Sequence, residues 1–187
     1  MKKELEQSIL DLLRAGGYIL YVRHGEATVG EDQPYFNFQD CYTQRNLSDY
    51  GRREAVYYGQ MLRYWQIPIN SPIIASPYCR TIETAQLAFP TMYIQIDPFW
   101  FEINKLGGAI SSTEQQQILM NVQSQLEIKP PLGTNQVIVA HNFPKGVGLG
   151  EIPNMGTMIL KPRGVGNGYE IVKLLPLADL ATLGSQL

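Results

Sequence analysis

Both histidines of the chain lie just after an apolar segment. The run Tyr18 to Val22 ends in Arg23 and His24, and the run 137–140 ends in His141. Arginine carries a permanent charge on a planar fork that matches a phosphate, and histidine can serve as a base or a nucleophile. Phosphoryl chemistry is therefore one interpretation. The alternative is a buried arginine and histidine that only cap a strand.

A third apolar segment, 71–75, leads through Ser76 to Arg80. Because proline fits the first turn of a helix, we predict that Ser76 is an N-cap, with Pro77 and Arg80 in the first turn. Apolar runs rich in β-branched residues are typical of buried parallel strands, and ligands bind where the carboxyl ends of such strands meet. The three segment ends would then surround His24 with donors for the equatorial oxygens of a phosphoryl group.

Helices and strands that could position these residues follow one another along the chain. Apolar spacing predicts helices at about 3–15, 49–66, 77–88 and 113–127. Strands are predicted at 18–22, 71–75, 93–96 and 137–140, followed by a hairpin of 157–161 and 169–175. Residues 99–108 read as an aromatic-rich loop. This order predicts an α/β fold, a three-layer sandwich with a mostly parallel central sheet and helices on both faces, in a single domain spanning 1–187.

Composition excludes several classes of protein. The 187 residues carry a formal net charge of -2, which gives no sign of a nucleic-acid or anionic-membrane surface. No apolar run approaches the roughly 18 to 20 residues of a spanning helix, and the first residues do not resemble a secretion signal. The spacing of Cys41 and Cys79 matches neither a metal knuckle nor a disulfide framework, which suits a reducing compartment. We therefore expect a soluble cytoplasmic protein with no membrane partner.

Four motifs occur in order, and they span roughly residues 18–161. They are Arg-His-Gly-Glu at 23–26, Asn-Leu-Ser-x-x-Gly-Arg at 46–52, Ser-Pro-x-x-Arg-Thr-x-Glu-Thr-Ala at 76–85 and Val-Ala-His-Asn at 139–142. With these motifs the chain resembles the histidine phosphatase superfamily, the phosphoglycerate mutase-like group. The resemblance implies the phosphoglycerate mutase-like version of the α/β fold described above.

The resemblance also implies roles for individual residues. His24 would be the nucleophile that becomes a phosphohistidine, while Arg23, Arg80 and His141 would bind the phosphoryl group. No metal and no other cofactor is implied. Fixed cations can replace the metal that other phosphatases use, and a histidine nucleophile splits hydrolysis into two easier in-line transfers. Glu26 and Glu83 belong to the motifs and are interpreted as structural.

The segment expected to carry the acid that protonates the leaving group departs from the clearest family pattern. Many members carry a Glu-x-x-x-Gly-x-x-Glu-Gly-like stretch after the second-arginine helix, whereas here Glu102 is the only carboxylate between Asp97 and Glu114. Its aromatic neighbours would raise its pKa by desolvation, as a general acid requires. We predict that Glu102 is the acid. The alternative is a loop glutamate that faces water, which would leave Glu151, Asp32 and Glu31 as candidates.

The function that the resemblance implies is a metal-independent histidine acid phosphatase-type phosphomonoesterase. Its substrate would be a small phosphorylated metabolite or a phosphorylated protein side chain. One alternative is a phosphoglycerate mutase-type isomerase, although the length leaves little room for the lid and longer tail of the cofactor-dependent mutases. A catalytically weak phosphate-binding domain is the other alternative. Nothing in the sequence indicates the oligomeric state.

Overall fold

A computed structural model describes residues 2–184, and for residues 2–8 it describes the backbone alone. The strands form one six-stranded sheet in the order β3-β2-β4-β1-β5-β6. Their bounds are β1 Ile19–Arg23, β2 Ile73–Ala75, β3 Ile94–Ile96, β4 Gln136–Ala140, β5 Thr157–Pro162 and β6 Tyr169–Leu175. The helices are α1 Lys2–Ala15, α2 Asp49–Tyr64, α3 Cys79–Ala88, α4 Ser112–Leu126 and α5 Leu177–Leu180, with 3₁₀ helices η1 Cys41–Thr43 and η2 Pro98–Gly107.

The sheet is mixed, with a parallel part that carries the predicted site. Strand β4 pairs in parallel with both β1 and β2, and β2 pairs in parallel with β3. Strands β5 and β6 are antiparallel and form the predicted hairpin. The mostly parallel sheet expected from the order of elements is thus confirmed. Because β2, β4 and β1 are neighbours, the residues that follow them lie at one edge of the sheet.

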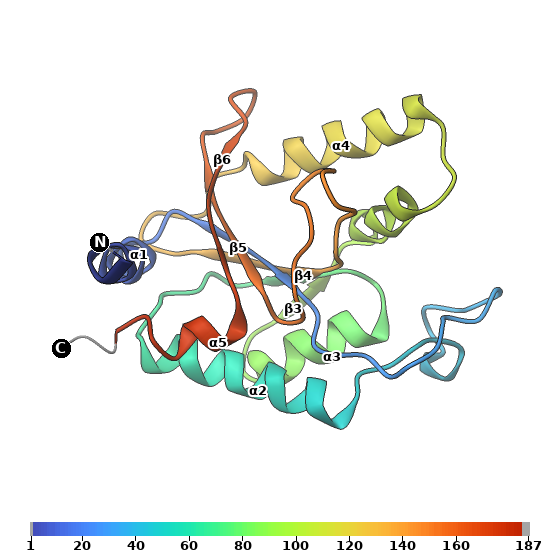
Figure 1. Cartoon of the computed structure of the whole chain (residues 1–187), viewed down its shortest axis with the longest axis horizontal. Helices are drawn as coiled ribbons and strands as arrows, with labels where there is room; N and C mark the ends of the chain where they lie inside the picture. Colours follow the sequence, from blue (N-terminus) through green and yellow to red (C-terminus); the bar gives the residue numbers. More distant parts are fainter. Residues whose placement is uncertain (1, 185–187) are drawn as a thin grey trace.

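Alternating side chains of the strands pack against two layers of helices. Leu20 and Val22 of β1 belong to a core cluster with residues of α1, α2, α3 and α5. Ile19 and Tyr21, which point the other way, pack with residues of η2 and α4. Figure 1 shows this arrangement, with α2, α3 and α5 below the sheet and α4 above it. The three-layer sandwich follows from the period of two in a strand that is buried on both faces.

Helix starts follow capping chemistry in two of the predicted places. The Ser48 side chain accepts a hydrogen bond from the Gly51 N–H and begins α2, as predicted. Ser111 caps α4 in the same way, and this helix begins at Ser112, one residue before its predicted start at 113. The segment predicted as an aromatic-rich loop is instead the 3₁₀ helix η2, capped by Asp97, with Pro98 in its first turn.

The N-cap predicted for α3 is wrong. The helix begins at Cys79, its N-cap position is Tyr78, and no side chain caps it. Ser76 lies two residues further upstream, where its hydroxyl contacts His141. Arg80 is nevertheless in the first turn of α3, as predicted.

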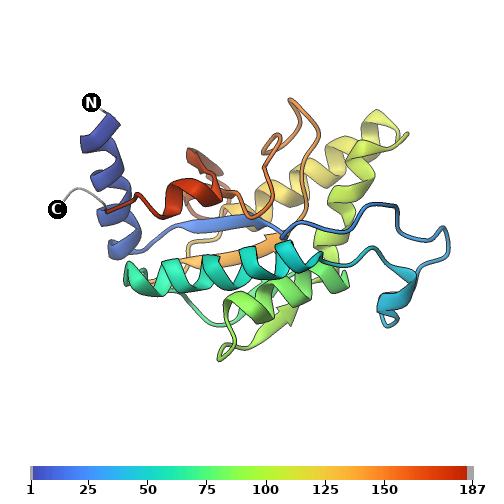
Figure 2. The ribbon, with the colours of Figure 1, turned by 60° about the horizontal axis from the view of Figure 1, so that its bottom comes forward.

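The interpretation of the two cysteines is also wrong. Cys41 and Cys79 form a disulfide with a Cα–Cα distance of 5.7 Å. The bond joins η1, in the segment between β1 and α2, to the start of α3. Figure 2 shows this segment extending from the end of β1 away from the body of the sheet. A single pair 38 residues apart has no spacing signature, because tertiary contacts alone bring its members together.

Within residues 2–184, no helix is both long enough and apolar enough to cross a membrane.

Candidate active site

The ends of β1, β4 and β2 bring His24, His141 and Ser76 together. The His24 N–H donates to the Ala140 carbonyl oxygen, and the Ser76 N–H donates to the Val139 carbonyl oxygen. These backbone bonds extend the parallel ladder past the strands. The two imidazole rings lie edge to face, with centroids 5.6 Å apart. The predicted meeting of the three strand ends is therefore confirmed.

His24 is buried and its ring is tethered at one nitrogen. Only 4% of the residue is exposed, and Nδ1 lies 2.7 Å from the Gly25 carbonyl oxygen. Since a carbonyl oxygen only accepts, Nδ1 carries the proton and Nε2 holds the lone pair. Burial, then the charge of Arg80, lowers the pKa of His24 to about 3, against the hydrogen bond to Gly25, which raises it. The ring is therefore neutral at pH 7, with its lone pair on Nε2.

Gly25 allows the chain to pass close to the start of α2. A Cβ atom at this position would lie 2.5 Å from the Gly51 carbonyl oxygen, and a Cβ at Gly51 would meet the Glu26 backbone at a similar separation. Both glycines are required by this close approach. Beyond them, the Glu26 carboxylate accepts from the Ser48 hydroxyl at 2.8 Å, and Glu83 pairs with Arg52. These contacts support the structural interpretation of Glu26 and Glu83.

His141 is held by Ser76 and Tyr78. Its Nε2 atom lies 2.6 Å from the Ser76 hydroxyl oxygen, and its ring meets the Tyr78 ring at a centroid distance of 4.9 Å. The residue is 2% exposed. Burial, followed by the nearby His24 and Arg80, lowers the pKa of His141 well below its ordinary value. A second neutral imidazole thus stands beside the first.

Arg23 lies at the end of β1 and has one fixed hydrogen bond. Its terminal NH1 donates to the Ile152 carbonyl oxygen at 2.8 Å, which ties it to the segment after β4. Burial, and then the charges of Arg45 and Arg80, lower the pKa of Arg23 against the opposing effect of Glu54. Three guanidinium groups therefore lie close enough to act on one another. Such a cluster creates a positive potential that attracts anions.

Arg80 reaches the site from the first turn of α3. Its NH1 and NH2 atoms lie 2.8 and 3.2 Å from the two carboxylate oxygens of Asp32, and NH1 also donates to the Arg45 carbonyl oxygen. The guanidinium carbon lies 4.0 Å from the centroid of the Tyr78 ring. The group is 5% exposed. Its charge is thus fixed in place by three partners.

Two buried N–H groups in this cluster have no acceptor. Among the side chains that the structure describes, Nε of Arg23 and Nε of Arg80 are the only buried nitrogen or oxygen atoms without a hydrogen-bond partner. Buried polar atoms are nearly always paired, and an unpaired one is costly. Both arginines act on the pKa of His24. The arrangement can therefore accept an anion whose oxygens pair with these donors near His24.

Glu102 lies on η2, and its polar partner in the structure is Lys105. The two side chains are 2.7 Å apart, and that of Glu102 is 33% exposed. The preceding residue, Phe101, packs with Phe36, Phe38 and Tyr78, and Tyr78 in turn contacts His141. The aromatic cluster therefore links η2 to the site. The general-acid role of Glu102 stays a prediction.

Sequence reasoning missed the contact of Asp32 with Arg80 and the contact of the Ser76 hydroxyl with His141. Asp32 belongs to no motif, and its partner Arg80 lies 48 residues further along the chain. The signal for Ser76 was present but was assigned to a helix cap. Within residues 2–184, no group of three or more His, Cys, Asp or Glu side chains gathers as metal ligands.

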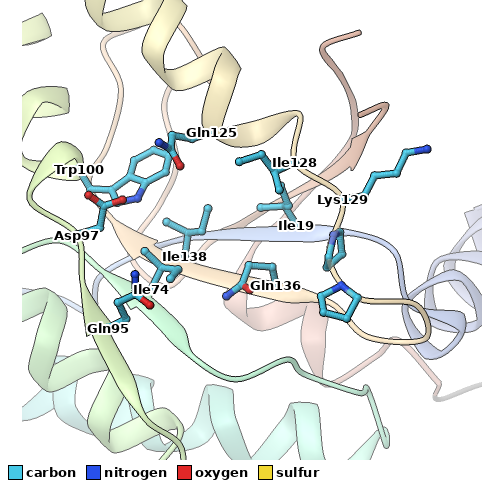
Figure 3. A pocket seen from close by; sticks show the side chains of 12 residues that line it. Ile19, Ile74, Gln95, Asp97, Trp100, Gln125, Ile128, Lys129, Gln136 and Ile138 are labelled. Carbon is cyan, nitrogen blue, oxygen red and sulfur yellow. The ribbon is translucent and has the colours of Figure 1, made fainter. Parts of the chain in front are cut away.

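A cavity of about 260 Å³ that none of His24, His141, Arg23 and Arg80 lines lies on the sheet face covered by η2 and α4. Figure 3 shows Ile19, Ile74 and Ile138 at its floor, with Trp100 and Gln136 at its sides. Ile19 and Gln136 open β1 and β4, so the cavity lies toward the amino ends of these two strands. The histidines follow the carboxyl ends.

No protein-family model and no curated protein matches the sequence. Solved structures do match the fold. Phosphoserine phosphatase from Entamoeba histolytica, solved as a mutant with phosphoserine, is 18% identical, with a TM-score of 0.53 over 86% of this chain and 97% of its own. A mycobacterial glucosyl-3-phosphoglycerate phosphatase complexed with VO3 is 16% identical, with a TM-score of 0.58 over 86% of this chain and 100% of its own.

A third structure, the putative phosphohistidine phosphatase SixA from Agrobacterium tumefaciens, is 16% identical, with a TM-score of 0.50 over 85% of this chain and 97% of its own. All three proteins are phosphatases by name. At such identities the likeness concerns the fold, and it confirms the phosphoglycerate mutase-like α/β fold that the motifs predicted.

Proposed function

We propose that the protein hydrolyses phosphomonoesters through a phosphohistidine formed on Nε2 of His24. The observation that carries this proposal is the pair of buried, unpartnered Nε–H groups of Arg23 and Arg80, two residues whose charges act on the His24 ring. A phosphoryl group supplies oxygens for both donors at once, and its phosphorus would then face the imidazole. Preorganised donors of this kind stabilise the charge on the equatorial oxygens of the transition state.

In the first half-reaction, the lone pair of His24 Nε2 attacks phosphorus in line with the ester oxygen. The P–N bond forms, the P–O bond to the alcohol breaks, and the departing oxygen takes a proton from the acid, which we assign to Glu102. The imidazole becomes positively charged. The Gly25 carbonyl oxygen, 2.7 Å from Nδ1, stabilises that charge through its hydrogen bond.

In the second half-reaction, water attacks phosphorus from the side that the alcohol has left. The carboxylate that gave up its proton accepts one from this water, the P–N bond breaks, and its electron pair returns to Nε2. Inorganic phosphate leaves and both groups regain their starting states. Nothing is consumed except water and the ester, so the cycle needs no redox partner.

His141 completes the set of phosphate ligands in this proposal. Its Nε2 already has a partner in the Ser76 hydroxyl, which fixes the plane of the ring. Because the pKa of His141 is lowered well below its ordinary value by burial, the ring enters the reaction neutral. With Nε2 accepting from the Ser76 hydroxyl, the single N–H of the neutral ring is on Nδ1, and it would donate to a phosphoryl oxygen without adding a full charge. Arg23 and Arg80 supply the charge that balances the phosphoryl group.

The proposed substrate class is a small phosphorylated metabolite or a phosphorylated protein side chain. The matching structures support this range, since they include phosphatases named for phosphoserine, glucosyl-3-phosphoglycerate and phosphohistidine.

The disulfide indicates in which compartment the protein would meet such a substrate. Structural disulfides are rare in the cytosol, so the Cys41–Cys79 bond favours an oxidising compartment over the cytoplasmic location expected from the sequence.

The test is a screen of the purified protein against phosphorylated metabolites, phosphoamino acids, nitrophenyl phosphate and a phosphohistidine protein. We expect turnover of at least one class, and none by the His24→Ala variant. Thermal melting shows whether that variant is folded. Equal turnover by wild type and His24→Ala would refute the nucleophile, and the absence of turnover by wild type on every class would favour a phosphate-binding domain.

A further inference from the structure

The guanidinium of Arg80 presents two edges to its surroundings, and Asp32 covers one of them. A guanidinium can bind an anion end-on, through NH1 and NH2, or side-on, through Nε and one terminal nitrogen. Both oxygens of Asp32 lie on the end-on edge, at 2.8 and 3.2 Å. The side-on edge contains Nε, which is buried and has no partner. One edge is therefore closed and the other is open.

Two further contacts prevent the guanidinium from turning. The Tyr78 ring covers one face at 4.0 Å, and NH1 also donates to the Arg45 carbonyl oxygen at 3.2 Å. Tyr78 fixes the plane of the group, whereas Asp32 fixes its rotation within that plane. Without Asp32, the one remaining hydrogen bond, from NH1 to the Arg45 carbonyl oxygen, would still permit the guanidinium to rotate within its plane. The direction in which the Nε edge points therefore depends on the carboxylate that holds the other edge.

Asp32 is itself placed by the loop that carries it. Its Oδ1 atom accepts the backbone N–H of Arg45 at 2.9 Å. The same loop closes on itself through the bridge of Ala27 with Leu47 and the hydrogen bond from the Gln33 N–H to the Thr43 carbonyl oxygen. The carboxylate is therefore presented to Arg80 by an ordered segment and not by a free side chain. Its side chain is 23% exposed, against 5% for Arg80.

We propose that Asp32 is a positioning residue that holds Arg80 with its Nε–H edge toward the phosphoryl group on His24. The inference rests on the proposed function, because it assigns Arg80 a phosphoryl oxygen. It also explains why an acidic side chain lies among residues proposed to bind an anion. Asp32 contacts the outer edge of Arg80 and stays there when the inner edge is filled.

A competing role for Asp32 makes the opposite prediction. If the carboxylate only occupied the fork in place of substrate, its charge would repel the incoming anion, and removing the charge would tighten phosphate binding. If Asp32 positions Arg80, removing the charge loosens phosphate binding. Asparagine is the sharpest substitution because it keeps the size of the side chain. Its amide nitrogen is a donor that would face an N–H donor of Arg80, so one of the two hydrogen bonds between the residues would be lost.

The experiment measures the dissociation constant of inorganic phosphate by calorimetry on the full chain, so it does not depend on turnover. We expect Asp32→Asn to raise this constant about tenfold, in line with the loss of one charged hydrogen bond, and Asp32→Glu to recover part of the affinity. In kinetics on nitrophenyl phosphate, KM should rise more than kcat falls. Asp32→Asn should add little in an Arg80→Lys background, because Asp32 acts through Arg80.

Asp40→Asn is the matched control. It removes a carboxylate from the same loop, while asparagine keeps the cap that Asp40 makes with the Tyr42 N–H. Phosphate affinity should be unchanged. The positioning role would be overturned if folded Asp32→Asn bound phosphate as tightly as wild type or more tightly, and Asp32→Glu bound it as wild type does. The proposed function would stand in that case. A wild-type protein that binds no phosphate would overturn both, whereas binding without turnover would refute only the hydrolase.

Discussion

Nδ1 of His24 lies 2.7 Å from the carbonyl oxygen of Gly25. This contact fixes the tautomer without any charged partner, because the carbonyl requires a proton on Nδ1. The free lone pair is on Nε2. The glycine that supplies the carbonyl is itself required by its contact with Gly51, so the motif Arg-His-Gly-Glu encodes the histidine together with the orientation of its ring.

Neither histidine is expected to titrate in the range of about pH 5 to 8 where an unperturbed imidazole does so. Burial and the nearby guanidinium groups lower the pKa of His24 to about 3 and that of His141 well below its ordinary value. Carbon-detected NMR of the two imidazole rings measures both directly. A midpoint near pH 6.5 for His24 would show that the ring is neither buried nor surrounded by cations.

The same shifts make stability depend on pH. Because the folded pKa of His24 is below its unfolded value of about 6.5, the unfolded chain binds the extra proton as the pH falls below that value. Stability should therefore be fully present above about pH 6.5 and decrease as the pH is lowered toward 3. Thermal melts at several pH values should show a smaller loss for folded His24→Asn than for wild type.

Arg80→Lys should weaken vanadate inhibition at least about tenfold. Vanadate resembles the five-coordinate transition state, which a complementary site binds more tightly than substrate. Lysine keeps the charge but cannot keep Asp32 on one edge and an oxygen on the other. Inhibition constants measured by competition with nitrophenyl phosphate test this, with Arg163→Lys at an exposed ion pair with Glu170 as the control. An unchanged constant for Arg80→Lys would mean that charge alone matters at this position.

Local patterns predicted the elements and the clustering of the site, but not the contacts between distant segments. The histidines could be placed because each directly follows a strand, and parallel neighbours share an edge. Ser76 was misassigned because Ser-Pro resembles a helix start, and only the closeness of β2 to β4 reveals His141 as its partner. Asp32 and the cysteine pair have no local signal, since the folding of one loop onto α3 creates both contacts.

The Cys41–Cys79 disulfide should stabilise the fold. For a separation of 38 residues, the loop-entropy model gives about 3 to 4 kcal/mol in the free energy of unfolding. Urea unfolding of wild type and the double Cys41→Ser, Cys79→Ser variant measures the difference. A dithiol reductant should lower wild-type stability and leave the double variant unchanged. Equal stabilities without reductant would mean that the loop is held by its other contacts alone.

Glu102→Gln should slow the hydrolysis of alkyl phosphates by roughly 100- to 10,000-fold, as expected for a lost general acid. Nitrophenyl phosphate, whose leaving group is stable as an anion, should form the phosphoenzyme at a nearly unchanged rate. Single-turnover measurements with both esters separate the two cases. Glu114→Gln, at the first turn of α4, is the control. Small and equal effects on both esters would make Glu102 a bystander in its ion pair with Lys105.

The most direct test of the account is the chemical identity of the trapped intermediate. Wild-type protein is mixed briefly with labelled substrate, quenched in alkali and digested, and the phosphopeptide is examined by mass spectrometry and NMR. We expect an acid-labile, alkali-stable phosphoryl group on Nε2 of His24, and none in His24→Ala. A label on Nδ1, on His141 or on a serine would contradict the central claim.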